Sequence, residues 1–247
     1  MSLNDVLSDL GKYLEFEIEE GRNTAAVSKQ SLAALGRRRS ARPVPPPGPM
    51  TPTAEDALAG VAEEVARCTK CSLHETRTKP VPGQGSARPE IMFIGEAPGY
   101  DEDRQGLPFV GRAGELLTKM IDAMGFTREE VFIGNILKCR PPNNRVPLPD
   151  EMDTCLPYLK RQIAALCPKV IITLGATAAK GLLDTTTGIT KLRGQWRRFE
   201  GIDVMPTYHP AYLLRTPSAK REAWEDLKAV LEHLGRPIPE RSQKGNR

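Results

Sequence analysis

The chain has 247 residues, with 35 Lys or Arg and 31 Asp or Glu, so its formal net charge is only +4. That length accommodates one sizeable α/β domain, or one domain with an appendage. The weak charge excludes a histone-like protein that binds nucleic acid through a basic tail, although it leaves room for a local basic face. The apolar runs are far shorter than the about 20 residues of a membrane span, and the acidic N-terminus lacks the apolar core of a secretory signal. We therefore expect a cytoplasmic protein without a membrane partner.

Residues 1–53 are predicted to lie outside the main domain. Residues 1–21 carry six acidic residues and one Lys, and their apolar residues recur at the spacing of an amphipathic helix. A basic stretch follows, and then six Pro between positions 43 and 52, which is typical of a semi-rigid linker. This extension is either a short helix on a partly disordered tether or a helix that binds a partner protein. The main domain is expected over residues 54–235, and a basic tail over 236–247.

The main domain alternates short apolar runs with helical patterns. Four runs are predicted as strands: Ile91–Ile94, Val131–Leu137, Val170–Leu174 and Ile202–Met205. Helices are predicted between and after them: Gly111–Met124, Asp150–Leu166, Ala176–Leu183 and Lys220–Leu234. This alternation predicts an α/β fold with a parallel sheet covered by helices on both faces. Ligands bind at the carboxyl ends of the strands in such sheets, so we expect the chemistry in the loops that follow the strands.

Four of the five cysteines are spaced like metal ligands. Cys68 and Cys71 form a Cys-x-x-Cys pair, Cys139 follows a predicted strand, and Cys155 comes 16 positions later. Four thiolates suit structural zinc or an iron–sulfur cluster, and the spacing does not separate the two. Core thiols that meet by coincidence, and a redox-active pair, are the weaker alternatives. Cys167 is predicted to be a buried small apolar residue.

Polar and aromatic residues lie at or just after the ends of the predicted strands. Glu96 follows the first strand in a tight turn, where a catalytic base or a water-positioning group would lie, although a surface turn explains it equally well. Phe109 lies on a Gly- and Pro-framed loop, either capping the core or offering a flat face to a planar ligand. Asn135 interrupts an apolar run, so it either serves the backbone or recognises a ligand. His209 is the one histidine at a predicted strand's carboxyl end.

A basic patch surrounds Trp196 and is formed by Lys191, Arg193, Arg197 and Arg198. An aromatic side chain among cations is typical of a surface that follows a phosphate backbone. A solvated hairpin turn is the alternative. A dinucleotide site is excluded, because the only Gly-x-Gly precedes the first strand instead of following it.

Taken together and in this order, four elements resemble one family, the family 4, iron–sulfur-containing uracil-DNA glycosylases. These elements are the cysteines at 68, 71, 139 and 155 and the segments GEAPGYDEDRQGLPFVGRAG, GNILKCRPPNNRVPLPDE and HPAYLLR. The resemblance extends roughly from Val65 to Leu234. It implies a three-layer α/β/α fold with a four-stranded parallel sheet, and a structural [4Fe–4S] cluster held by Cys68, Cys71, Cys139 and Cys155. It also implies a monomer that acts on uracil-containing DNA of the nucleoid and hydrolyses the N-glycosidic bond of deoxyuridine in base excision repair.

The resemblance also assigns roles to single residues around a uracil flipped out of the duplex. His209 stabilises the charge that develops at uracil O2, and Glu96 positions the attacking water. Asn135 reads the O4 and N3 edge of the base, and Phe109 stacks on its face. The remaining contacts with the base come from Gly95, Ala97 and Glu102.

The other roles implied concern thymine and the DNA around the uracil. Glu102 is expected to crowd the C5 methyl group of thymine, and Leu213 to fill the gap in the base stack. Arg215 and the basic patch around Trp196 are expected to bind phosphates. Some similar proteins bond covalently to the abasic sugar through a His in a basic loop, but Ile189–Trp196 contains no His. We therefore expect a hydrolytic enzyme. A covalently trapping or a non-catalytic, metal-stabilised DNA-binding protein of the same fold is the alternative.

Overall fold

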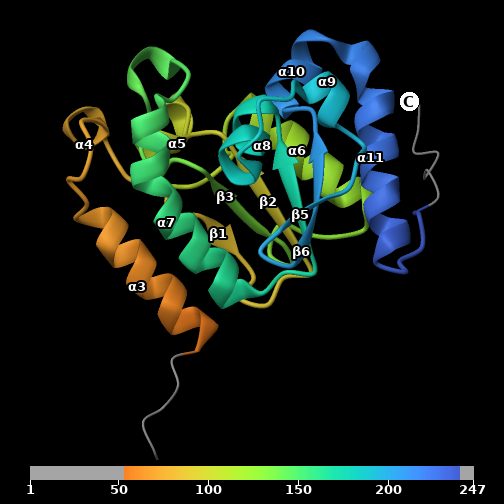
Figure 1. Ribbon diagram of the computed structural model, residues 1–247, viewed down its shortest axis with the longest axis horizontal. Coiled ribbons are helices and arrows are strands. Elements are labelled where there is room, and N and C mark those ends of the chain that lie inside the picture. The colour runs from red at the N-terminus through yellow and green to blue at the C-terminus, as the bar shows by residue number, and fades with distance from the viewer. Residues whose placement is uncertain (1–52, 240–247) are drawn as a thin grey trace, which may run out of the picture. The chain divides into compact units, whose positions relative to one another are not determined.

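The computed structural model describes residues 53–239, coloured in Figure 1. The predicted N-terminal extension, up to residue 52, and residues 240–247 of the predicted tail lie outside this part of the chain. No helix within residues 53–239 is long and apolar enough to cross a membrane.

A six-stranded sheet forms the centre of the domain. Its strands are β1 (Gln84–Gly85), β2 (Ile91–Gly95), β3 (Phe132–Asn135), β4 (Val170–Leu174), β5 (Arg197–Phe199) and β6 (Ile202–Thr207), in the order β1-β3-β2-β4-β6-β5. The four predicted strands are the parallel centre. The predicted strand number is wrong, because β1 and β5 add an antiparallel strand at each edge. Both are too short and too polar to produce an apolar run.

Helices connect the strands and cover the sheet. They are α3 (Ala54–Ala66), α4 (Leu73–Thr76), α5 (Tyr100–Gln105), α6 (Arg112–Ala123), α7 (Pro149–Leu166), α8 (Ala176–Leu183), α9 (Ile189–Leu192), α10 (Pro210–Arg215) and α11 (Lys220–His233). Two short 3-10 turns, Pro142–Asn144 and Pro217–Ala219, complete the described elements. The four predicted helices correspond to α6, α7, α8 and α11.

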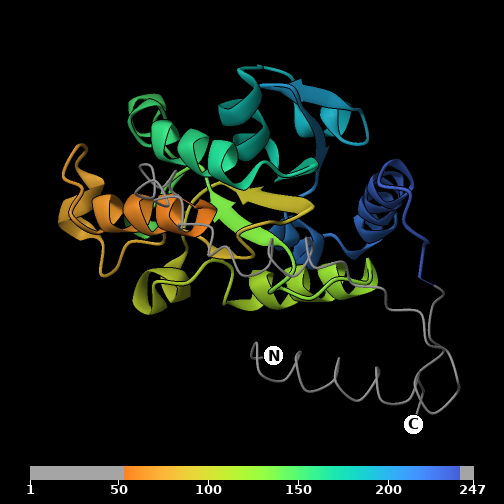
Figure 2. The same ribbon diagram turned by 90° about the horizontal axis from the view of Figure 1, so that it is seen from below.

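The alternation of side chains along β2 explains the three layers. Ile91 and Phe93 point to one face, where they join the core that α6 and α11 cover. Met92 and Ile94 point to the other face and pack with residues of α7 and α8. Both faces are apolar because successive side chains of a strand point to opposite sides. Figure 2 shows the sheet between the layer of α7 and α8 and the layer that contains α6, which confirms the predicted α/β/α architecture.

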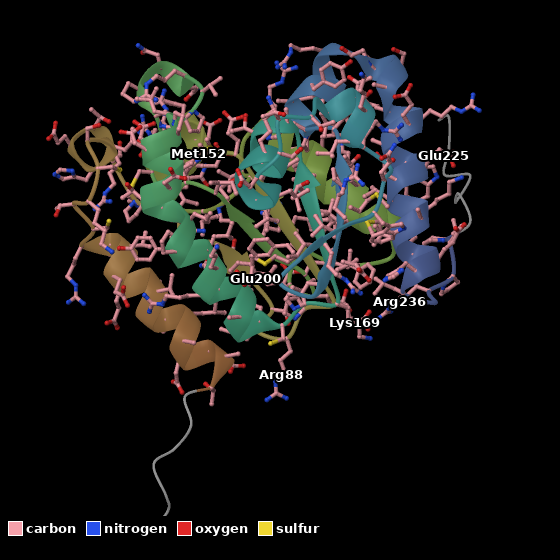
Figure 3. All side chains as sticks on the ribbon, in the orientation of Figure 1. Arg88, Met152, Lys169, Glu200, Glu225 and Arg236 are labelled. Carbon is pink, nitrogen blue, oxygen red and sulfur yellow. The ribbon has the colours of Figure 1, made fainter. Side chains whose placement is uncertain are left out.

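The amino-terminal end of the sheet is closed by ion pairs. Glu90, which precedes β2, binds Lys169 before β4 at 2.6 Å and Arg236 after α11 at 2.6 Å. Lys169 and Arg236 lie together at this end of the molecule in Figure 3. These ion pairs lie at the end of the sheet opposite to the carboxyl ends of the parallel strands.

The prediction for Cys167 is wrong, because its side chain is exposed. Cys167 ends α7 in the left-handed conformation, with φ 44°. This geometry turns the side chain away from the sheet, and the thiol donates a hydrogen bond to the carbonyl oxygen of Ala164 at 3.0 Å.

Candidate active site

A cavity of about 540 Å³ opens at the carboxyl ends of β2, β3 and β6. The loops after these strands bring together most of the residues that the sequence singled out. The lining includes Glu96, Ala97, Glu102, Phe109, Asn135, His209 and Arg215. In Figure 1 these loops lie at the upper edge of the sheet, between α5 and α10.

Gly95 is buried and does not itself line the cavity, but its missing side chain lets Asn135 and Phe109 approach closely. A Cβ atom at this position would lie 2.6 Å from Cζ of Phe109 and would overlap Oδ1 of Asn135. Phe109 has a positive φ of 52°, which costs energy in a non-glycine residue and indicates a site under constraint. Its ring lies against the ring of His209, with centroids 5.8 Å apart. The floor of the cavity therefore combines one flat aromatic face with one amide and one imidazole.

Asn135 carries an unmet hydrogen-bonding capacity. Its side chain is buried, with 1% exposure, and its Oδ1 has no hydrogen-bond partner. Burying such an atom costs about 1–3 kcal/mol, so its presence calls for an explanation. Asn135 also lines the cavity, so its amide group is a candidate for contact with a ligand.

Lys138 supports the backbone of Asn135 and is a site residue that the sequence does not predict. Its fully buried ammonium group donates to the carbonyl oxygen of Asn135 at 2.8 Å and to Oε1 of Gln162 at 2.8 Å. The amide of Gln162 in turn donates to the carbonyl oxygen of Pro82 at 2.7 Å. Burial lowers the pKa of Lys138 to about 8. A Lys beside a Cys at a strand end carries no sequence signal for burial, since lysines are almost always exposed.

The backbone after Asn135 joins this floor to the loop that carries Glu96. The N–H of Ile136 donates to the carbonyl oxygen of Gly95 at 3.0 Å, and the N–H of Leu137 donates to that of Glu96 at 3.1 Å. Glu96 is half-buried and lines the cavity. Its backbone is thus fixed from the neighbouring strand, while its carboxylate lies at the wall of the cavity.

His209 is held as a neutral hydrogen-bond donor. It precedes α10, and its Nδ1 accepts a hydrogen bond from the N–H of Ala211 at 3.0 Å. The proton of the neutral ring must then be on Nε2. Burial, followed by the positive charge of Arg215, lowers the pKa of His209 to about 4, against the opposing charge of Glu102.

Glu102 organises the loop around the cavity. Its carboxylate accepts hydrogen bonds from the backbone N–H groups of Gly99 at 3.1 Å, Val110 at 2.9 Å and Gly111 at 3.1 Å. These bonds join the start of α5 to the start of α6 and thereby fix the loop that carries Phe109. Crowding of the thymine methyl group by Glu102 stays a prediction.

The expected role of Leu213 is corrected by its burial. The side chain is 1% exposed and packs with Tyr208, Ala219 and Ala223, so it cannot enter a base stack from this position. The exposed apolar side chains of α10 are those of Tyr212 and Leu214. The short helix turns the side chain at position 213 inward.

The basic patch around Trp196 is also divided by the fold. Arg193 binds Asp226 of α11, with Nε 3.0 Å from Oδ2, and the buried carboxylate also accepts from the hydroxyl of Thr207 at 2.7 Å. Arg198 pairs with Asp203 at 3.2 Å, near the start of β6 and away from His209 at its other end. Both arginines have internal partners, so their expected phosphate contacts are not supported.

The other members of this patch, Lys191 and Arg197, are exposed, and their contacts with phosphate stay predictions. The cations that do line the cavity are Arg112, Arg145 and Arg215. Only Arg215 was singled out from the sequence. Arg112 and Arg145 lie within the motif segments, but neither has the aromatic neighbour that drew attention to the patch around Trp196.

The four predicted metal-binding cysteines line one second cavity, beside α3 and α7. Burial raises the pKa of Cys155 to about 11 and also raises that of Cys139. Arg77 donates to Sγ of Cys139 at 3.1 Å, and the N–H of Lys138 donates to Sγ of Cys155 at 3.3 Å. Within residues 53–239, no group of three His, Cys, Asp or Glu side chains could hold a single metal ion.

Comparison with known proteins identifies the class to which this fold and cavity belong. The family model described as "Uracil DNA glycosylase superfamily" matches residues 82–228. The type-4 uracil-DNA glycosylase of Sulfurisphaera tokodaii is 48% identical over 72% of this chain and 84% of its own length. The type-4 uracil-DNA glycosylase of Archaeoglobus fulgidus is 44% identical over 74% of this chain and 96% of its own length. That of Thermotoga maritima is 46% identical over 71% of this chain and 94% of its own length. The chain belongs to the uracil DNA glycosylase superfamily and, within it, to the type-4 uracil-DNA glycosylases.

The depressed pKa of His209 predicts a pH dependence of stability. The unfolded chain binds a proton at His209 below pH 6.5, whereas the folded protein resists protonation down to about pH 4. The contribution of neutral His209 to the free energy of unfolding should therefore be complete above pH 6.5 and be lost as the pH falls from 6.5 to 4. Urea unfolding of the parent and of His209→Gln across this range measures it. Equal slopes against pH for the two proteins would contradict the prediction.

Proposed function

We propose that the protein is a uracil-DNA glycosylase that hydrolyses the N-glycosidic bond of deoxyuridine in DNA, releases uracil and leaves an abasic site. The cavity at the strand ends carries this proposal. It combines the partnerless amide oxygen of Asn135, the aromatic ring of Phe109 and the neutral imidazole of His209. These groups match the N3–H donor, the flat face and the O2 acceptor of a uracil ring.

Recognition requires that the base leave the duplex, at a cost of a few kcal/mol. In the proposed complex, Phe109 stacks on the extruded ring and Oδ1 of Asn135 accepts from uracil N3–H. The Asn135 amide NH₂ then faces O4. Lys138 and the backbone bonds of Ile136 and Leu137 hold this edge in place, and the backbone of Gly95 and Ala97 allows the base to approach closely.

Cleavage separates charge, and two side chains respond to it. The electrons of the bond between C1′ and N1 move onto uracil, whose O2 becomes more negative and accepts a hydrogen bond from Nε2–H of His209. A preorganised donor of this kind is worth about 10²–10³ in rate. Glu96 orients a water molecule whose oxygen bonds to C1′ of the cationic sugar, and the carboxylate receives the proton that the water loses. The departing uracil anion takes a proton from solvent.

A direct assay of uracil release separates this proposal from its alternatives. Hydrolysis predicts many turnovers and free abasic DNA, whereas a non-catalytic DNA-binding protein would release no uracil. A covalently trapping protein would stop after one turnover as a protein–DNA adduct. Of the three histidines, His209 lines the cavity, while His74 binds the carbonyl oxygen of Cys71 and His233 lies against Trp196. This arrangement favours hydrolysis, because no second histidine lines the cavity to attack the sugar.

We also propose that Cys68, Cys71, Cys139 and Cys155 hold a structural [4Fe–4S] cluster. Support comes from the one cavity that all four cysteines line, two of them buried, and from the four-thiolate set itself, which suits an iron–sulfur cluster. When bound, it cross-links the segment before α4, the end of β3 and α7. The guanidinium of Arg77 at Cys139 partly balances the thiolate charge.

Replacing one ligand tests the cluster. Cys139→Ser should lower the iron and sulfide content, the visible absorbance and the temperature of unfolding, and activity should fall as a consequence. Cys167→Ser is the matched control, because Cys167 is exposed and is not among the residues lining that cavity. Stoichiometric zinc without iron or sulfide in the anaerobically purified parent would contradict the assignment.

Asn135→Asp tests the reading of the base. The change removes the amide donor to O4 and places a carboxylate beside it, whereas a carboxylate can accept from the amino group of cytosine. We expect most uracil activity to be lost, by about 10²-fold or more because wrongly paired buried groups discriminate strongly. Weak activity on cytosine should appear, mainly in mismatches.

Single-turnover cleavage of matched DNAs that carry uracil or cytosine at one position measures this effect. Thr127→Asp adds the same charge to an exposed residue before β3, at the end of that strand opposite the cavity, and serves as the control. An Asn135→Asp variant that cleaves uracil at the parent rate would show that Asn135 has only a structural role.

We further propose that residues 1–53 are dispensable for the chemistry, whether they form a tether or bind a partner protein. A capping box between Thr53 and Asp56 begins α3. A chain that starts at Thr53 should therefore remain a monomer and release uracil at a rate within about twofold of the full chain, since it keeps every lining residue of the cavity within residues 53–239. A folded but inactive truncated protein, judged by circular dichroism, would contradict this.

A further inference from the structure

Two apolar side chains stand out from the surface between β3 and α7. Val146 is 65% exposed, the most of any large apolar side chain in residues 53–239, and Leu148 is 48% exposed. Both belong to the segment 140–148, here called the mouth loop. Side chains of this kind cost free energy in water unless something covers them when the protein acts.

The mouth loop is held rigidly. The buried carboxylate of Glu151 accepts hydrogen bonds from Arg145 at 2.6 and 2.8 Å and from the backbone N–H of Leu148 at 2.8 Å. Arg145 also donates to the carbonyl oxygen of Val146 at 3.1 Å, and prolines flank Leu148 on both sides. The two apolar side chains are therefore presented in a fixed position, so little ordering entropy remains to be lost on binding.

The mouth loop forms one side of the opening of the active-site cavity. Pro141, Asn144 and Arg145 line that cavity, and Tyr212 and Arg215 of α10 line it as well. In Figure 1 the mouth loop and α10 rise at the same end of the sheet, on either side of the strands. DNA whose base enters the cavity would therefore lie close to both.

We propose that Val146 and Leu148 form an apolar wedge that packs against the base stack of duplex DNA beside the extruded uracil. This inference rests on the proposed glycosylase function. Duplex DNA is the occupant that we choose, because the cavity would take a base and because Arg112 and Arg215, which can attract phosphates, line its opening beside the acidic Glu96, Asp101 and Glu102. An extruded base leaves a gap that apolar side chains fill, and Leu213 is buried and cannot fill it.

The double variant Val146→Ser/Leu148→Ser tests the wedge, with Ile238→Ser as the control for loss of another exposed apolar side chain. Single-turnover uracil release is measured on a duplex and on the same strand alone. We expect at least about tenfold slower release from the duplex, since unstacking must be compensated there, and release within about twofold on the single strand. The parent should increase the fluorescence of a 2-aminopurine placed beside the uracil, because the base is unstacked. The double variant should not produce this increase.

Binding to a duplex with a tetrahydrofuran abasic analogue, followed by anisotropy, gives a readout that needs no catalysis. Weaker binding of the double variant supports the wedge even if the parent released no uracil, in which case only the proposed function would fail. Unchanged rates and affinities on the duplex, or equal losses on duplex and single strand, would overturn it. So would a parent dimer that the double variant dissociates, because the loop would then bind a second copy of the chain.

Discussion

The backbone between Asn135 and Cys139 is the constraint on which the rest of the site depends. Three successive N–H groups in this run donate to two other parts of the molecule: to the carbonyl oxygens of the consecutive residues Gly95 and Glu96, and to the sulfur of Cys155 in α7. Five residues thus connect the amide at the cavity floor, the loop that carries Glu96 and the cysteine-lined cavity. A shift of this run in any direction would break contacts at all three places.

This connection explains how a metal site without a catalytic role would still matter for activity. Lys138 lies at the junction, with its ammonium beneath Asn135 and its backbone at Cys155. Loss of order around the cysteines would therefore reach the cavity floor through one residue. The cost of burying the Lys138 charge is offset only while both of its acceptors stay in place.

The sequence predicts the parallel centre of the sheet because buried parallel strands leave continuous apolar runs, and it predicts Glu96, Asn135 and His209 because ligands bind where such strands end. The sequence does not predict the features that depend on contacts between residues far apart in the chain. The partner of Arg193 lies 33 residues away, so its apparent freedom was misleading. Lys138 resembles any surface lysine. Leu213 lies on a six-residue helix whose inward face depends on α11 and the turn before it, which no local pattern reveals.

The clamp between Glu151 and Arg145 also affects how the protein would move along DNA. Each phosphate that a free cation neutralises releases counterions and steepens the fall of affinity with salt, by a slope of about 0.9. The charge of Arg145 is already neutralised by the Glu151 carboxylate, which is 2% exposed. Arg145 therefore shapes the opening of the cavity but does not add to this salt dependence. The opening therefore has a lower affinity for undamaged DNA than the number of its arginines implies. A lower affinity shortens the residence time on undamaged DNA and speeds the search for uracil.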